Sequence, residues 1–123
     1  MNFTSFIVVA TIVAAVFGIA FLVVPAQLAA FYGIASTPGT DLVGRIGGSA
    51  ILGFAVVFWG IRNQSGAQAF KAAMLAGLIA NGLDCLILLQ ATATGLLNGY
   101  GWPQAAINGL LALGFGYFSF GKR

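Results

Sequence analysis

Long uncharged apolar runs alternate with short polar stretches along the chain. A run of roughly 17–25 apolar residues is long enough to cross a hydrocarbon core as a helix. Four such runs fall at about residues 6–24, 43–61, 72–90 and 103–120. The strands of a barrel would need alternating segments of about ten residues, a pattern that the chain lacks. The pattern therefore predicts an all-α polytopic membrane protein. We expect residues 1–123 to form a single four-helix transmembrane bundle without a soluble domain.

Turn and capping residues separate the first two runs. Pro25 ends the first run, because proline has no backbone N–H and its ring clashes with the preceding turn of a helix. The segment 25–34 is too short to span a membrane, and we expect it to form a short helix lying in the interface. A turn at residues 36–39 then precedes Thr40 or Asp41, and either side chain can cap the second long helix.

The composition agrees with a membrane protein and excludes several kinds of site. The chain is 60% hydrophobic and only 6% charged, and seven charges are too few to cover a water-soluble domain of this size. It has no His and one Cys, which excludes within this chain a zinc site, a His-ligated haem, a Cys-His pair and a Ser-His-Asp triad. We therefore expect a non-enzymatic protein without metal or cofactor. Five cations are also too few for a nucleic-acid partner.

The positions of the cations predict an orientation, because Lys and Arg concentrate on the cytoplasmic side. Arg62 and Lys71 flank the polar loop between the second and third runs. Lys122 and Arg123 end the chain, and only Arg45 lies toward the opposite side. This bias predicts both termini and the middle loop in the cytoplasm, with the protein in the bacterial cytoplasmic (inner) membrane.

Five polar residues inside the runs form a candidate polar intramembrane site. At about 1.5 Å per helical residue, Ser49, Asp84 and Asn108 each lie roughly 20 Å from the cytoplasmic boundary. Asn81 lies one turn nearer that boundary, at roughly 15 Å. Arg45 lies one turn further out, on the same helix face as Ser49, and its long side chain would reach Asp84 from there.

Two interpretations of this site remain open. Ionisable residues inside a membrane are costly and mark sites or pathways, so Asp84 would be a proton- or cation-linked group. Arg45 would then be its counter-ion or an anion ligand. Alternatively, the same residues form a buried polar clamp that locks helix packing without any ligand. Arg45 also has Asp41 four residues before it as a possible ion-pair partner, which would leave Asp84 without a cation.

Small residues recur at four-residue spacing in all four runs, a pattern that lets membrane helices approach closely. We expect these stripes to pack the bundle, and any spare stripe to serve self-association or docking to other membrane subunits. The stripes are Ala10, Ala14 and Gly18; Gly44 and Gly48; Ser49 and Gly53; Ala73 and Gly77; and Ala105, Gly109, Ala112 and Gly116.

The order of these features resembles small bacterial four-helix membrane proteins of the DoxX-like type and related uncharacterised families. The resemblance lies in a first span ending at a proline (LVVPAQLAAFYGI) and a glycine-rich second helix opening with an Arg (GRIGGSAILG). A third helix with a polar centre (LIANGLDCLILL) and an aromatic fourth helix (LALGFGYFSF) follow. The resemblance implies a four-helix bundle in the cytoplasmic membrane, of a kind often tied to redox or respiratory partners.

Three functional hypotheses follow from these observations. The first is a non-catalytic subunit or scaffold that packs against a larger membrane complex through its glycine faces. The second is a small oligomeric transporter or channel that uses the candidate polar site around Asp84 and Arg45. The third is a DoxX-like redox accessory protein. In each case the partners are the lipid bilayer together with other membrane subunits or further copies of this chain.

Overall fold

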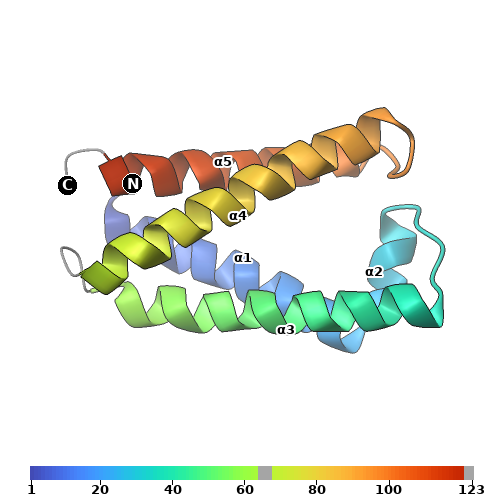
Figure 1. Cartoon of the computed structure of the whole chain (residues 1–123), viewed down its shortest axis with the longest axis horizontal. Coiled ribbons are helices and arrows are strands. Elements are labelled where there is room, and N and C mark those ends of the chain that lie inside the picture. The colour runs from blue at the N-terminus through green and yellow to red at the C-terminus, as the bar shows by residue number, and fades with distance from the viewer. Residues whose placement is uncertain (64–67, 121–123) are drawn as a thin grey trace.

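The computed structural model describes residues 1–63 and 68–120, and these residues are helical apart from short connections. Five helices follow one another: α1 (Phe3–Val23), α2 (Pro25–Phe31), α3 (Pro38–Ile61), α4 (Gln68–Ala93) and α5 (Gly101–Phe120). The four long helices run antiparallel, so that the start of α1 and the end of α5 share one end of the molecule (Figure 1). The helix α2 lies at the opposite end. The all-α class is confirmed.

Three of the long helices, α1, α3 and α4, are long and apolar enough to cross a membrane. The helix α5 is not among them, although it has 20 residues. Its first half carries Pro103, Gln104 and Asn108, which lower its mean hydropathy. The fourth span therefore stays a prediction. Most of the predicted middle loop (64–67), together with Lys122 and Arg123, lies outside the described residues.

Capping residues set where the helices begin. Asn2 Oδ1 accepts a hydrogen bond from the Ser5 amide at 2.8 Å and starts α1. The cap of α3 is Thr37, so the expectation of Thr40 or Asp41 was wrong. Thr37 Oγ1 accepts from the Thr40 amide at 3.1 Å, and Thr40 Oγ1 accepts from the Thr37 amide at 2.8 Å. The helix starts earlier because Pro38, with its fixed φ, is suited to the first helical position.

The short helix expected after Pro25 is present as α2. Pro25 occupies its first turn, where the missing N–H costs no hydrogen bond. The helix ends before Gly33, whose φ of 78° lies in the left-handed region that glycine adopts readily. This turn directs the chain across the end of the molecule toward α3.

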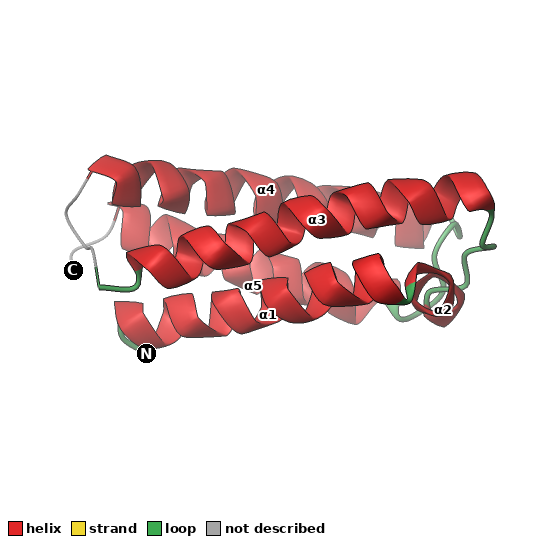
Figure 2. Ribbon diagram, turned by 90° about the horizontal axis from the view of Figure 1, so that it is seen from below, coloured by secondary structure: helices red, strands yellow, loops and turns green. Residues whose placement is uncertain are grey.

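The helices associate as two pairs, α1 with α3 and α4 with α5, and contacts between the pairs are far fewer (Figures 1 and 2). Glycines bring α1 and α3 together. A Cβ atom on Gly48 would lie 2.8 Å from the Gly18 carbonyl oxygen and 2.7 Å from Phe21 Cβ. The predicted packing role of this stripe is therefore confirmed for Gly18 and Gly48. Ser49 and Gly53, by contrast, are exposed.

An aromatic cluster joins the two pairs at the end that carries the start of α1. The rings of Phe6 and Phe58 each lie 5.0 Å from the ring of Phe115, centroid to centroid. Gly77 provides the space for Phe115, since a Cβ atom there would lie 2.5 Å from its ring. Buried aromatic pairs of this kind each contribute about 0.5–1.5 kcal/mol beyond their buried area. We call the end of the bundle that carries Phe6 the inner end. The aromatic cluster holds the four long helices together there.

Candidate functional site

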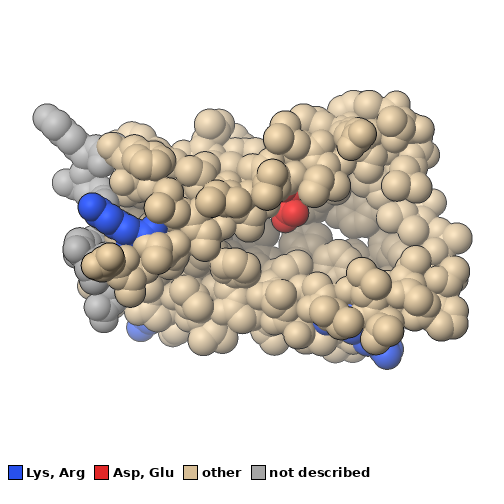
Figure 3. Space-filling model, viewed as in Figure 1, with Lys and Arg blue, Asp and Glu red and all other residues tan. Residues whose placement is uncertain are grey.

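A cavity of about 700 Å³ lies between the two helix pairs. All five helices contribute to its mainly apolar lining, which continues from Phe58 and Phe115 toward α2. Figure 3 shows the molecule hollowed on this face, with acidic atoms at the edge of the hollow. Sites for small molecules typically measure about 300–1,000 Å³ and are mostly apolar with a few polar groups. The cavity has the size and composition of such a site.

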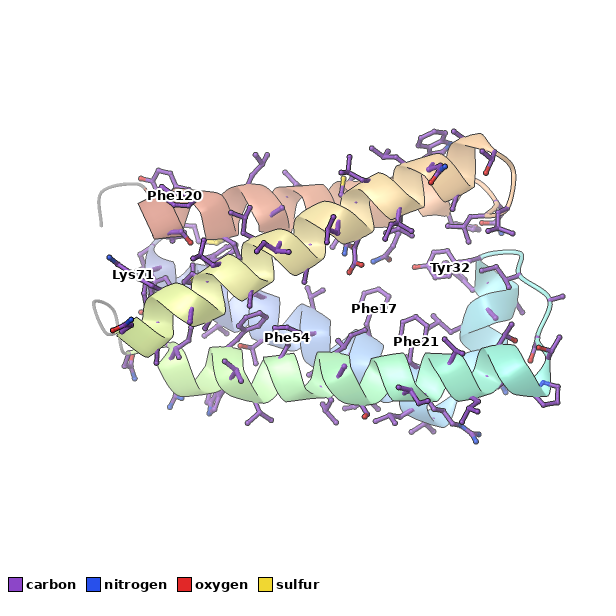
Figure 4. The ribbon with its side chains drawn as sticks, in the orientation of Figure 1. Phe17, Phe21, Tyr32, Phe54, Lys71 and Phe120 are labelled. Carbon is purple, nitrogen blue, oxygen red and sulfur yellow. The ribbon has the colours of Figure 1, made fainter. Side chains whose placement is uncertain are left out.

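Aromatic side chains form one wall of the cavity. Phe17 and Phe21 project into it from α1, and Tyr32 projects into it from the turn after α2 (Figure 4). Phe54 of α3 lines it closer to the aromatic cluster. This wall offers ring faces and apolar surface to whatever the cavity holds.

A chain of hydrogen bonds begins at Tyr32 in this aromatic wall and continues along the opposite wall, which α4 and α5 form. The Tyr32 hydroxyl donates to Gln104 Oε1 at 2.6 Å. Gln104 Nε2 donates to Asn108 Oδ1 at 3.1 Å, as residues four apart on one helix face can. Asn108 Nδ2 then donates to Asp84 Oδ2 at 3.4 Å and to Asn81 Oδ1 at 3.5 Å. These five residues, the polar chain, all line the cavity.

Asp84 is the ionisable end of the polar chain. Its side chain is exposed at the cavity, and only its Oδ2 atom accepts a hydrogen bond from a described residue. None of the residues lining the cavity is Lys or Arg. A charged group in such surroundings is costly unless it is paired. The carboxylate lines the cavity with one oxygen, Oδ1, that accepts no hydrogen bond and with no counter-ion among residues 1–63 and 68–120.

The other end of the polar chain is fixed by the loop before α5. Asn98 Nδ2 donates to the Phe31 carbonyl oxygen at 2.9 Å, and the Asn98 amide donates to the Tyr32 carbonyl oxygen at 3.0 Å. The rings of Phe31 and Tyr100 stack 4.5 Å apart. Burial raises the pKa of the Tyr32 phenol, so this group remains a hydrogen-bond donor to Gln104 into the alkaline range.

The structure brings together three of the five predicted site residues, Asn81, Asp84 and Asn108. It does not bring Arg45 and Ser49 to them, because both side chains are exposed on α3 and neither lines the cavity.

The expected contact between Arg45 and Asp84 was wrong for the part of the chain that the structure describes. The helix α3 turns its Gly44 and Gly48 face toward α1, and the next residue along is rotated by about 100°. Nor does Arg45 pair with Asp41 in this part of the chain. The Asp41 carboxylate instead accepts a hydrogen bond from Ser36 Oγ at 2.7 Å.

Two residues of the polar chain, Tyr32 and Gln104, are absent from the sequence-based site. Gln104 carries a usable signal, since it lies four residues before Asn108 and therefore shares its helix face. Tyr32 carries none, because no spacing rule relates it to a residue 72 positions away. Only the packing of α2 against the last loop places the phenol there.

The donors and acceptors of the site suit ion pairing and hydrogen bonding. Within the described ranges, no three His, Cys, Asp or Glu side chains lie together in a way that would hold a metal ion. The groups available to a ligand are the carboxylates of Asp84 and Asp41, a chain of amides and a phenol.

Comparisons of the chain with protein-family models, with curated proteins and with solved structures find no match. The resemblance to DoxX-like proteins therefore stays a prediction, and the function is argued from the site alone.

Proposed function

We propose that this chain is a small membrane protein that binds a lipophilic small molecule between its two helix pairs, as the binding subunit of a carrier or transporter. The observation that carries the proposal is the cavity of about 700 Å³ with the polar chain along one wall. A clamp that only locked packing would bring the helices together around its polar residues. Here Asp84 instead faces open space, which favours a site for a ligand.

The proposed setting is a membrane that the chain crosses four times. The helix α5 packs along α4, and its polar residues Gln104 and Asn108 line the cavity. This arrangement supports α5 as a fourth span whose low hydropathy comes from cavity-facing residues. The start of α1 and the end of α5 share one end of the molecule (Figure 1). Together with the cation bias, this supports both termini in the cytoplasm of a bacterium, with the protein in its cytoplasmic membrane.

A cavity-filling substitution tests the binding function. Ala80 lines the cavity from α4, so Ala80→Phe would place a ring where the ligand would lie. Ala72 is exposed on the same helix and does not line the cavity, which makes Ala72→Phe the matched control. We expect native mass spectrometry of the protein from mild detergent to find a bound small molecule with the wild type and Ala72→Phe. The proposal fails if Ala80→Phe retains the same bound mass.

A second candidate function is the scaffold subunit, and the outer face of α3 favours it. Ser49, Gly53 and Gly60 are exposed close to one face of this helix, and a Cβ atom on either glycine would meet nothing within 4 Å. Such a face lets another membrane helix approach closely. Mass measurement of the purified protein tests this function, with Gly53→Leu as the blocking variant. A monomer without a co-purifying subunit would argue against it.

A further inference from the structure

The geometry points to an organic monocation with an apolar body as the ligand class of this cavity, with the Asp84 carboxylate as its counter-charge. This inference rests on the proposed function, because it concerns the same cavity.

The first argument is the charge of the lining. The cavity is lined by two acidic residues, Asp41 and Asp84, and by no basic residue. Asp41 already has partners, since it lies in the first turn of α3 and accepts from Ser36 Oγ. Each carboxylate has one oxygen that accepts from no described residue, but Asp84 lies in the middle of α4, away from any helix N-terminus. Asp84 is therefore the carboxylate that lacks compensation for its charge and that a cation would stabilise most.

The second argument is the direction of the hydrogen bonds. From Tyr32 through Gln104 and Asn108, each group donates to the next and the last donates to Asp84. Aligned bonds of this kind polarise one another. The polar chain therefore ends in an atom without a hydrogen bond, Asp84 Oδ1, and this atom is an acceptor. A ligand that offers only acceptors, such as a ketone, can meet only the second N–H of the Asn81 and Gln104 amides and leaves Asp84 Oδ1 without a partner.

The third argument is the aromatic wall opposite. The rings of Phe17, Phe21 and Tyr32 project into the same cavity (Figure 4). A cation over an aromatic face is attracted by the ring quadrupole, most strongly where water is excluded. The same rings cover the apolar body of a ligand. Carboxylate on one wall and rings on the other therefore favour one ligand class over neutral or anionic molecules of the same size.

Two probe ions of the same shape and opposite charge test the inference. Tetraphenylphosphonium is a lipophilic monocation, and tetraphenylborate is its anionic counterpart. Triphenylphosphine oxide serves as a neutral probe with an acceptor only. Binding of each is measured by equilibrium dialysis against the full chain in lipid nanodiscs at neutral pH, with empty nanodiscs as background. We expect saturable binding of the cation, and binding of the other two at least about tenfold weaker.

Variants assign the binding to Asp84. We expect Asp84→Asn to weaken binding of tetraphenylphosphonium about tenfold or more, while Asp84→Glu retains most of it. Asp41→Asn is the matched control, since it removes the other acid that lines the cavity. Ala80→Phe should abolish binding of every probe, and thermal unfolding confirms that each variant is folded.

The outcomes separate the two proposals. If the neutral probe binds as tightly as the cation, and Asp84→Asn changes nothing while Ala80→Phe still blocks, the ligand class is overturned and the binding function stands. An effect of Asp41→Asn equal to that of Asp84→Asn overturns the assignment to Asp84. If no probe binds above empty nanodiscs, or Ala80→Phe has no effect, both proposals fall.

Discussion

At the scale of single residues, the contact between α1 and α3 depends on the missing side chain of Gly48. A Cβ atom there would lie 2.8 Å from the Gly18 carbonyl oxygen, which is backbone and has no rotamer to change. We predict that Gly48→Ala lowers the free energy of unfolding by about 1–3 kcal/mol, because overpacking forces the helices apart. Denaturant titration in detergent, followed by circular dichroism, measures the change.

The neighbouring residue provides the control for this prediction. A Cβ atom on Gly47 would meet nothing within 4 Å, so Gly47→Ala adds no clash. Alanine also favours the helix over glycine by up to about 1 kcal/mol. We expect unchanged or slightly raised stability, and equal losses in the two variants would contradict the packing account.

The phenol of Tyr32 gives a second prediction at this scale. Tyr32→Phe removes the donor to Gln104 Oε1 and leaves the ring in place. We predict a loss of about 0.5–1.5 kcal/mol in the free energy of unfolding, the usual net value of one hydrogen bond. Tyr100→Phe is the control, because the stacked ring of Tyr100 has no hydrogen bond from its hydroxyl within the described residues. A larger loss in the control would contradict the role given to Tyr32.

The residue scale also shows how far the sequence predicts the site. Counting residues from the membrane boundary places Asn81, Asp84 and Asn108 at neighbouring depths, and the structure brings them together. The same counting places Ser49 at that depth, but depth contains no information on rotation about the helix axis. Rotation follows from which face packs against α1, and the glycines of two adjacent faces of α3 look alike in the sequence.

At the scale of elements, apolar run length predicts the number and order of the long helices. It underestimates the length of the helices, because polar residues can occupy their first and last turns. The helix α3 begins at Pro38, five residues before the predicted run, and α4 extends from Gln68 to Ala93. Proline and glycine signals suffice to predict α2. The pairing of α1 with α3 and of α4 with α5 rests on long-range packing, which no local pattern reveals.

The attachment of α2 to the last loop yields an element-scale prediction. Asn98→Ala removes the bond from Asn98 Nδ2 to the Phe31 carbonyl oxygen. We predict that amides of α2 exchange with solvent deuterium roughly two- to tenfold faster, since one hydrogen bond less holds this end. Amides near Phe6 should exchange unchanged, because the aromatic cluster is intact. Leu96→Ala, at an exposed position of the same loop, is the control. A uniform increase over the whole chain would contradict a local effect.

At the scale of the whole molecule, the number of membrane crossings is the main prediction. In a Cys85→Ala background, single cysteines at Asn2, Gly99 and Phe120 are labelled with a membrane-impermeant thiol reagent. Four crossings predict that positions 2 and 120 react from one side of the membrane and position 99 from the other. Phe120 is 76% exposed, so its replacement is accessible to the reagent. If positions 99 and 120 react from the same side, α5 does not cross.

The two ends of the molecule are fastened unequally. Buried rings from all four long helices form the inner end, whereas hydrogen bonds such as Tyr32 with Gln104 and the exposed stacked rings of Phe31 and Tyr100 hold the other. A rotation of one helix pair against the other would therefore be centred on the inner end. At about 1.5 Å per residue the far ends lie about 30 Å from it, so a rotation of roughly 5° displaces them by about 3 Å. That displacement exceeds what a hydrogen bond tolerates. On the proposed function, an opening of the far ends that admits a ligand would therefore also break the bond between the Tyr32 phenol and Gln104, and so separate the phenol from the chain that ends at Asp84.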